Sequence, residues 1–82
     1  MTLESLIKER RESLGVTQSQ LASRMKTTIQ FLSNIERGAA RLPVKHFRAF
    51  SKILHLNIKD MVDLRIRDLR NEICENLKIS GS

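Results

Sequence analysis

The chain has 82 residues, of which 40% are hydrophobic and 29% are charged, and its formal net charge is +6. This length allows one domain with a small core, and the composition is that of a globular protein, which argues against disorder of the whole chain. No apolar run approaches the ~18 residues that a membrane span requires, and there is no secretory leader. We therefore expect a cytoplasmic protein with no membrane partner.

The positive charge is concentrated in the first part of the chain. Residues 1–50 carry nine basic and four acidic side chains, whereas residues 51–82 carry six and five. A polyanionic partner requires such a basic region. A membrane surface would also attract it, but the sequence lacks a basic helix with a bulky apolar face.

The sequence contains no pattern typical of an enzyme or a metal site. Cys74 is the only cysteine, and His46 and His55 do not have metal-ligand spacing with it. We expect Cys74 to be a small buried residue; the alternative is a redox-active thiol. There is no glycine-rich phosphate loop and no catalytic constellation, so we expect no catalysis, no metal and no cofactor.

The first predicted helix begins after Thr2, which can cap it, and runs to about Ser13, with Gly15 ending it. Apolar residues at helical spacing predict its buried stripe. These residues are Leu3, Leu6, Ile7 and Leu14.

Residues 17–38 predict two short helices joined by a tight turn at Lys26. Thr17 and Gln20 have the spacing of a capping box at the start of the first helix. Thr28 can cap the second helix, and Gly38 supplies the left-handed residue that ends it. The inward residues expected from helical spacing are Leu21, Ala22 and Met25, then Phe31, Leu32 and Ile35.

The second of these helices leaves one contiguous outward face that is almost free of acidic residues. It consists of Ile29, Gln30, Ser33, Asn34 and Arg37. Amide and hydroxyl groups can hydrogen-bond to base edges, and an aliphatic group can contact a thymine methyl. The alternative is an ordinary solvated face.

Three segments of the chain resemble the helix-turn-helix of the Cro/C1-type phage repressor family. The segments are LGVTQSQLASRM, TTIQFLSNIERG and LPVKHF, within about residues 3–64. The resemblance implies an all-α, five-helix, lambda-repressor-like domain over residues 1–64, with the helix-turn-helix at 17–38. The family usually has glycine where this chain has Lys26 and His55, and each departure costs roughly 1 kcal/mol if the residue is left-handed.

The resemblance also implies roles for individual residues. It implies that Arg11 pairs with Glu36, the alternative being a solvated charge, and that Gln18 contacts a phosphate and braces the start of the recognition helix. It places the base contacts at Ile29, Gln30, Ser33 and Asn34. The expected phosphate contacts are Gln18, Thr28, Arg37, Arg41 and Lys45. For Arg41 and Lys45 the position after the recognition helix favours this role, and the alternative is a solvated side chain.

After a loop over 39–42, Pro43 suits the first turn of a further helix. Its expected apolar face consists of Val44, Phe47, Phe50, Ser51 and Leu54, with Ile53 alongside.

Asn57 can cap a last helix, in which Ile58, Met61 and Leu64 are expected to face inward. A helix over 59–77 is predicted, with residues 78–82 forming a disordered tail. A narrow apolar seam runs along it, formed by Val62, Ile66, Leu69, Ile73 and Leu77. Such a stripe needs a partner, and we expect a second copy of the chain, partly as a coiled coil. The alternative is that it folds back on its own domain.

The sequence thus predicts a homodimeric transcriptional regulator that binds a roughly palindromic operator in double-stranded DNA. The simplest mechanism is repression by occupancy, with activation left open. An antitoxin or a restriction-modification controller would share the domain, and an antitoxin would hold a toxin with its C-terminal helix. A protein-interaction adaptor that has lost DNA binding is the alternative from another class; the net charge of +5 on residues 1–50 argues against it.

Overall fold

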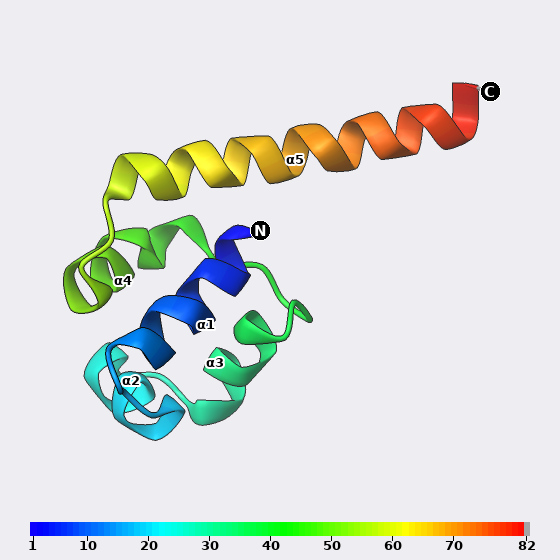
Figure 1. The fold of residues 1–82 in the computed structure, drawn as a ribbon. Coiled ribbons are helices and arrows are strands. Elements are labelled where there is room, and N and C mark those ends of the chain that lie inside the picture. The colour runs from blue at the N-terminus through cyan, green and yellow to red at the C-terminus, as the bar shows by residue number, and fades with distance from the viewer. Residues whose placement is uncertain (82) are drawn as a thin grey trace.

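The computed structural model describes the backbone of residues 1–81 and the side chains of residues 1–77, and this part of the chain is helical without strands (Figure 1). The elements are α1 (Leu3–Ser13), α2 (Gln18–Met25), α3 (Ile29–Glu36), the short 3-10 helix η1 (Val44–His46), α4 (Phe47–Leu54) and α5 (Ile58–Gly81). The predicted all-α fold of five helices is confirmed.

The first three helices each begin at a threonine cap. Thr2 and Thr17 form capping boxes with Ser5 and Gln20, in which the threonine side chain accepts from the backbone N–H three residues on. Thr28 Oγ1 accepts a 3.0 Å hydrogen bond from the Phe31 backbone N–H. Each cap satisfies an N–H group that has no partner within the helix, which fixes where the helix starts.

Two of the turns that follow helices use left-handed residues other than glycine. Lys26 has φ 57° after α2, and His55 has φ 55° after α4. These are the two positions at which the chain departs from the family's glycines. Gly15 and Gly38 also have positive φ, at 70° and 76°.

α1 packs against α3, α4 and α5, and it lies between α5 and the pair α2 and α3 in the view of Figure 1. All five α-helices and the loop before η1 contribute to one core. Its buried members are Leu3, Ile7, Leu21, Ala22, Leu32, Ile35, Leu42, Phe47, Phe50, Leu54 and Met61.

Three predicted inward residues are exposed instead. Leu14 is 40% exposed because it is the C-cap of α1 and lies beyond the last packed turn. Val44 is 72% exposed because the chain enters η1 there, and Leu42 is the residue of this segment that enters the core. Ile58 precedes the packed turn of α5, where Met61 is fully buried. Leu6 is only partly buried.

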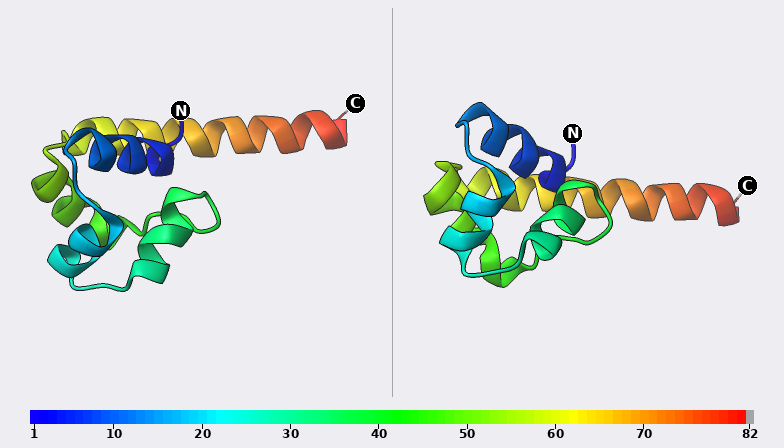
Figure 2. Two further views of the ribbon diagram at one scale, coloured as in Figure 1. Left: turned by 60° about the horizontal axis from the view of Figure 1, so that its bottom comes forward. Right: turned by 90° about the horizontal axis from the view of Figure 1, so that it is seen from below.

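α5 has 24 residues and is therefore about 36 Å long. Its first turns pack against α1 and α4, and the rest projects past the domain as an arm (Figures 1 and 2). This arm makes the molecule elongated, with extents of 46 × 25 × 22 Å. Within the part of the chain that is described, no helix is both long and apolar enough to cross a lipid bilayer.

The prediction that Cys74 is buried was wrong, because this residue lies exposed on the arm, where the domain does not cover it. The predicted disordered tail, 78–82, concerns residues whose side chains, and for Ser82 the backbone as well, lie outside those described.

Candidate nucleic-acid interface

A buried ion pair joins α1 to the C-terminal end of α3. Arg11 Nε donates to Glu36 Oε2 at 2.6 Å, and Arg11 Nη2 donates to Glu36 Oε1 at 2.9 Å. Hydrogen bonding to Glu36 raises the pKa of the Arg11 guanidinium, so this group stays charged despite its burial. Arg11 Nη1 also donates to the Val16 carbonyl oxygen at 2.7 Å, which ties the start of α2 to the same group.

Gln18 adds a third partner to this pair. Its Nε2 donates to Glu36 Oε1 at 3.0 Å. The first residue of α2 is thereby fixed to the last residue of α3, so the two helices of the helix-turn-helix are held by a polar contact as well as by apolar packing. The phosphate contact expected of Gln18 is a separate matter and stays a prediction.

The ion pair has an electrostatic consequence for α3. Glu36 is the one acidic residue in this helix, and it is buried against Arg11 and Gln18. The outward face of α3 therefore carries no carboxylate that would repel a polyanion.

That outward face is accessible over most of its length. Ile29 is 50% exposed, and Gln30 and Arg37 are also exposed, whereas Ser33 and Asn34 are partly buried. On the opposite side of α3, Leu32 and Ile35 are fully buried. The five residues predicted from the spacing thus share one surface.

Hydrogen bonds link three of the polar side chains on this face. Gln30 Nε2 donates to Asn34 Oδ1 at 3.0 Å, and Arg37 Nη2 donates to the same oxygen at 2.6 Å. The Asn34 backbone carbonyl accepts from the N–H groups of Ala39 and Ala40. Asn34 is therefore connected both to its neighbours on the face and to the turn after α3.

Residues of η1 and of the turn before α3 lie next to this helix. Phe31 packs at its side, with its ring 5.3 Å from that of His46 in an edge-on geometry. Lys45 is exposed in η1, and Lys26 is exposed in the turn before α3. Thr28 caps α3 with its hydroxyl, at the start of the face.

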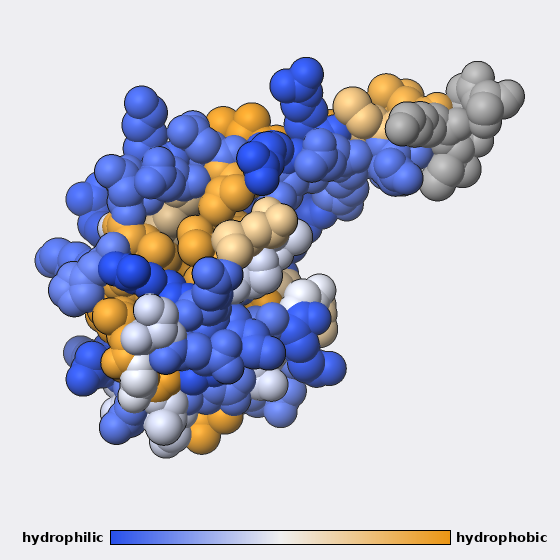
Figure 3. Space-filling view, in the orientation of Figure 1, coloured by the Kyte–Doolittle hydropathy of each residue, from blue (hydrophilic) through white to orange (hydrophobic). Residues whose placement is uncertain are grey.

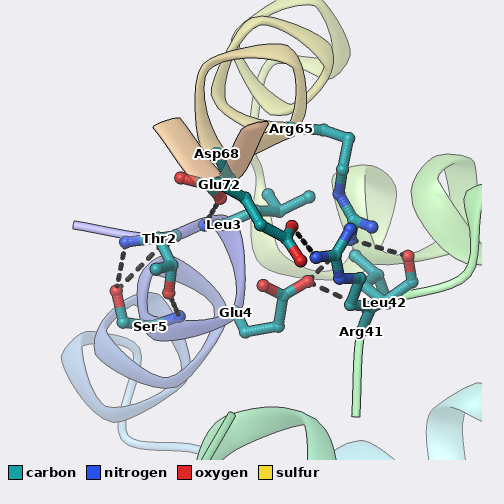
Figure 4. A network of polar contacts seen from close by, with 9 residues as sticks. All are labelled: Thr2, Leu3, Glu4, Ser5, Arg41, Leu42, Arg65, Asp68 and Glu72. Carbon is teal, nitrogen blue, oxygen red and sulfur yellow. Dashed lines mark hydrogen bonds and ion pairs between the residues drawn. The ribbon is translucent and has the colours of Figure 1, made fainter. Parts of the chain in front are cut away.

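Arg41 does not point freely to solvent, because it pairs with Glu72 on α5 (Figure 4). This ion pair turns the side chain toward the arm. No local pattern predicts this contact, since the two residues are 31 positions apart.

A second buried cluster lies beside Arg41, and sequence reasoning missed it (Figure 4). Arg65 Nη2 donates to Glu4 Oε2 at 2.6 Å and to the Leu42 carbonyl oxygen at 2.8 Å. Glu4 Oε2 also accepts from the Leu42 N–H at 2.9 Å, and Asp68 Oδ2 accepts from the Leu3 N–H at 3.0 Å. These bonds fix the loop after α3 to both α1 and α5.

The apolar seam of α5 lies on its exposed surface, where hydrophobic side chains emerge along the arm (Figure 3). A shallow, largely apolar groove there is lined by Ile66, Leu69, Arg70, Ile73 and Cys74. The five seam residues Val62, Ile66, Leu69, Ile73 and Leu77 are between 38% and 63% exposed. α5 packs on the domain through other residues, among them Met61, Leu64 and Arg65.

Two capped helices at a tight turn, the second with an exposed face free of acids, define a helix-turn-helix DNA-binding domain. A family model described as helix-turn-helix matches residues 7–61. The chain belongs to this family, the Cro/C1-type helix-turn-helix proteins, which are DNA-binding transcription regulators and typically not enzymes.

Two solved structures are similar to the whole chain. One is the clp gene regulator ClgR from Corynebacterium glutamicum, with a TM-score of 0.66 and 19% identity, covering 95% of this chain and 88% of that one. The other is from a complex of the SinR and SinI proteins, with a TM-score of 0.67 and 22% identity, covering 99% of this chain and 80% of that one. A search of curated proteins finds no match. At these identities the two structures establish a common fold.

Proposed function

We propose that the protein is a dimeric transcriptional repressor that acts in the cytoplasm by occupying a roughly palindromic operator. The observation that carries this proposal is the outward face of α3, which is exposed, polar and free of carboxylates because Glu36 is bound by Arg11. A face of this composition matches the donor and acceptor pattern of base edges in the major groove.

Base contacts are assigned to Ile29, Gln30, Ser33 and Asn34. Around them, basic groups at Lys26, Arg37 and Lys45 are exposed and suited to phosphate contacts, which fix the position of a protein on DNA without selecting a sequence. Arg41 joins this set only if its ion pair with Glu72 opens, because a carboxylate already occupies its guanidinium.

The exposed apolar seam of α5 supports dimerisation. In a single copy of the chain, Ile66, Leu69 and Ile73 leave an apolar groove open to water. Pairing of two arms would bury this groove. The simplest mode of repression is that bound protein excludes polymerase from the promoter.

Selection of bound sequences from a random duplex library tests the proposal. We expect enrichment of two inverted half-sites whose centres lie ~34 Å apart, or a multiple of that distance. The proposal is wrong if correctly folded protein binds all duplexes equally and binds heparin just as well. Sedimentation of the protein with and without the selected duplex gives the number of subunits bound.

A second candidate concerns the occupant of the seam. One of the similar structures is a complex between two different proteins, and the similarity extends over 99% of this chain, including α5. A regulator whose arm holds another protein, as in an antitoxin, would use the same domain for DNA. A protein that co-purifies stoichiometrically and keeps the arm from pairing with a second copy would favour this candidate.

A further inference from the structure

The hydrogen bonds on the outer face of α3 determine which atoms this face presents to a base. Asn34 Oδ1 lies 2.6 Å from Arg37 Nη2. A guanidinium can only donate hydrogen bonds, so the Asn34 atom that faces it must be the carbonyl oxygen. The Gln30 atom that lies 3.0 Å from the same oxygen must then be the amide nitrogen, because two facing oxygens would repel each other.

These two hydrogen bonds determine which end of the Asn34 and Gln30 amides is the oxygen and which is the nitrogen. Among the described residues, no side chain or carbonyl accepts a hydrogen bond from Asn34 Nδ2, so both of its hydrogens are available to a ligand. Gln30 retains its Oε1 as an acceptor and the second hydrogen of Nε2 as a donor. The face therefore offers a donor and acceptor pair at Gln30, and donors alone at Asn34.

Base edges in the major groove distinguish these two patterns. Adenine presents an acceptor at N7 and a donor at N6, which is the complement of the Gln30 amide. Guanine presents acceptors at N7 and O6, and thymine presents one at O4, whereas the amino groups of adenine and cytosine would oppose an N–H group. N7 alone would not distinguish guanine from adenine, but a group that can only donate is favoured opposite O6 of guanine or O4 of thymine and disfavoured opposite the amino group at the same position of adenine or cytosine.

We propose that Asn34 determines the base preference of α3 in two ways: its Nδ2 group selects a keto base, guanine or thymine, and its Oδ1 orients Gln30 toward adenine. Arg37 acts as a positioning residue in this arrangement, because its bond to Oδ1 prevents the Asn34 amide from turning over. The inference rests on the proposed function, since it concerns the same DNA-binding face.

The test compares the sequences that are selected from a random duplex library by the wild-type protein and by two variants, Asn34→Asp and Asn34→Ala. The carboxylate of Asn34→Asp keeps an acceptor for Gln30 and Arg37 but has no donor. We expect it to exchange the keto base for an amino base at one half-site position, while adenine at the Gln30 position is retained. The Asn34→Ala variant should relax both positions, each by roughly five- to 150-fold in relative affinity.

A matched control separates base selection from general loss of binding. Lys45→Met removes an exposed positive charge that has no contact with the amide chain. We expect this variant to weaken binding to all duplexes alike and to leave the selected bases unchanged. Circular dichroism of each variant verifies that the helical fold is retained.

The possible results are distinct. If Asn34→Asp still selects a keto base, Asn34 does not act as a donor, and the first part of the inference is wrong. If Asn34→Ala leaves the adenine preference intact, Asn34 does not orient Gln30, and the second part is wrong. If the wild-type protein selects no sequence at all, the proposed function itself fails, and this outcome is separate from the other two.

Discussion

Arg11 and Glu36 form a buried, bidentate ion pair between α1 and the end of α3, with N–O distances of 2.6 and 2.9 Å. The exposed fraction of the Glu36 side chain is 2%, so its charge is almost fully removed from water. The same pair neutralises the acidic residue of α3 and fixes the position of this helix on α1. Fold stability and the electrostatics of the outward face of α3 therefore depend on one contact.

Loss of one partner of this pair is expected to be costly. Arg11→Met would leave the Glu36 carboxylate buried with only Gln18 as a hydrogen-bond partner. We expect the free energy of unfolding to fall by about 3–5 kcal/mol, the typical effect of leaving an uncompensated buried charge. Urea denaturation followed by circular dichroism measures this change. As a control, Arg24→Met on the exposed side of α2 should change it by less than about 0.5 kcal/mol.

The left-handed residues after α2 and α4 predict a substitution that raises the free energy of unfolding. Lys26 has φ 57°, a conformation that glycine adopts without steric cost. Lys26→Gly should therefore stabilise the fold by about 1 kcal/mol, visible as a higher midpoint of thermal unfolding. Gly38→Ala is the converse test: a Cβ there would meet no atom within 4 Å, so any loss of stability, again about 1 kcal/mol, comes from φ +76° alone. Equal stability of Lys26→Gly and the wild type would contradict the assumed strain.

Features set by neighbouring residues could be predicted from the sequence, and features set by distant residues could not. The threonine caps and the periodicity of α3 are local, and they gave the correct helix starts and the correct inward residues, Leu32 and Ile35. Arg11 and Glu36 are 25 positions apart, and only resemblance to a family brought them together. No local pattern indicated that Glu4 would bind Arg65, which is 61 positions away.

The errors in predicted burial have a related cause. Cys74 was expected to be buried because free cysteines commonly are, but this assumes that the domain covers all of α5. α5 instead projects beyond the domain after its first turns. Cys74 is exposed because it lies in this projecting part of the helix, beyond the contact with α1. Leu42 was assigned to a loop with no role in the core, and it enters the core, where Glu4 and Arg65 satisfy its backbone N–H and C=O.

The ion pair between Arg41 and Glu72 predicts that the arm weakens DNA binding. Both side chains are about half exposed, so the pair itself contributes at most about 1 kcal/mol and can open. Glu72→Gln should free Arg41 for a phosphate, increase affinity for all sequences alike and steepen the dependence of log K on log salt by up to ~0.9. Fluorescence anisotropy of a labelled duplex over a range of salt concentrations measures the slope.

Two further variants decide whether this effect passes through Arg41. Glu75→Gln removes the same charge from an exposed position of α5 and should change the slope less than Glu72→Gln does. Arg41→Ala in the Glu72→Gln background should cancel the gain. If Glu72→Gln and Glu75→Gln behave identically, the effect is one of net charge, and Arg41 makes no phosphate contact.

Substitution of Leu69 tests whether the seam joins two copies of the chain. Leu69 is 38% exposed and lies between Ile66 and Ile73 in the apolar groove, outside the buried core. Leu69→Asp should leave the fold intact but weaken dimerisation, since each copy loses the still exposed part of the leucine side chain, worth up to about 1 kcal/mol, and places a carboxylate in the seam. Sedimentation equilibrium should then show a monomer, and affinity for a full operator should fall toward that for a half-site. Asn71→Asp introduces the same charge on another face of α5 and should remain dimeric; a dimer that persists in Leu69→Asp would place the contact between subunits elsewhere.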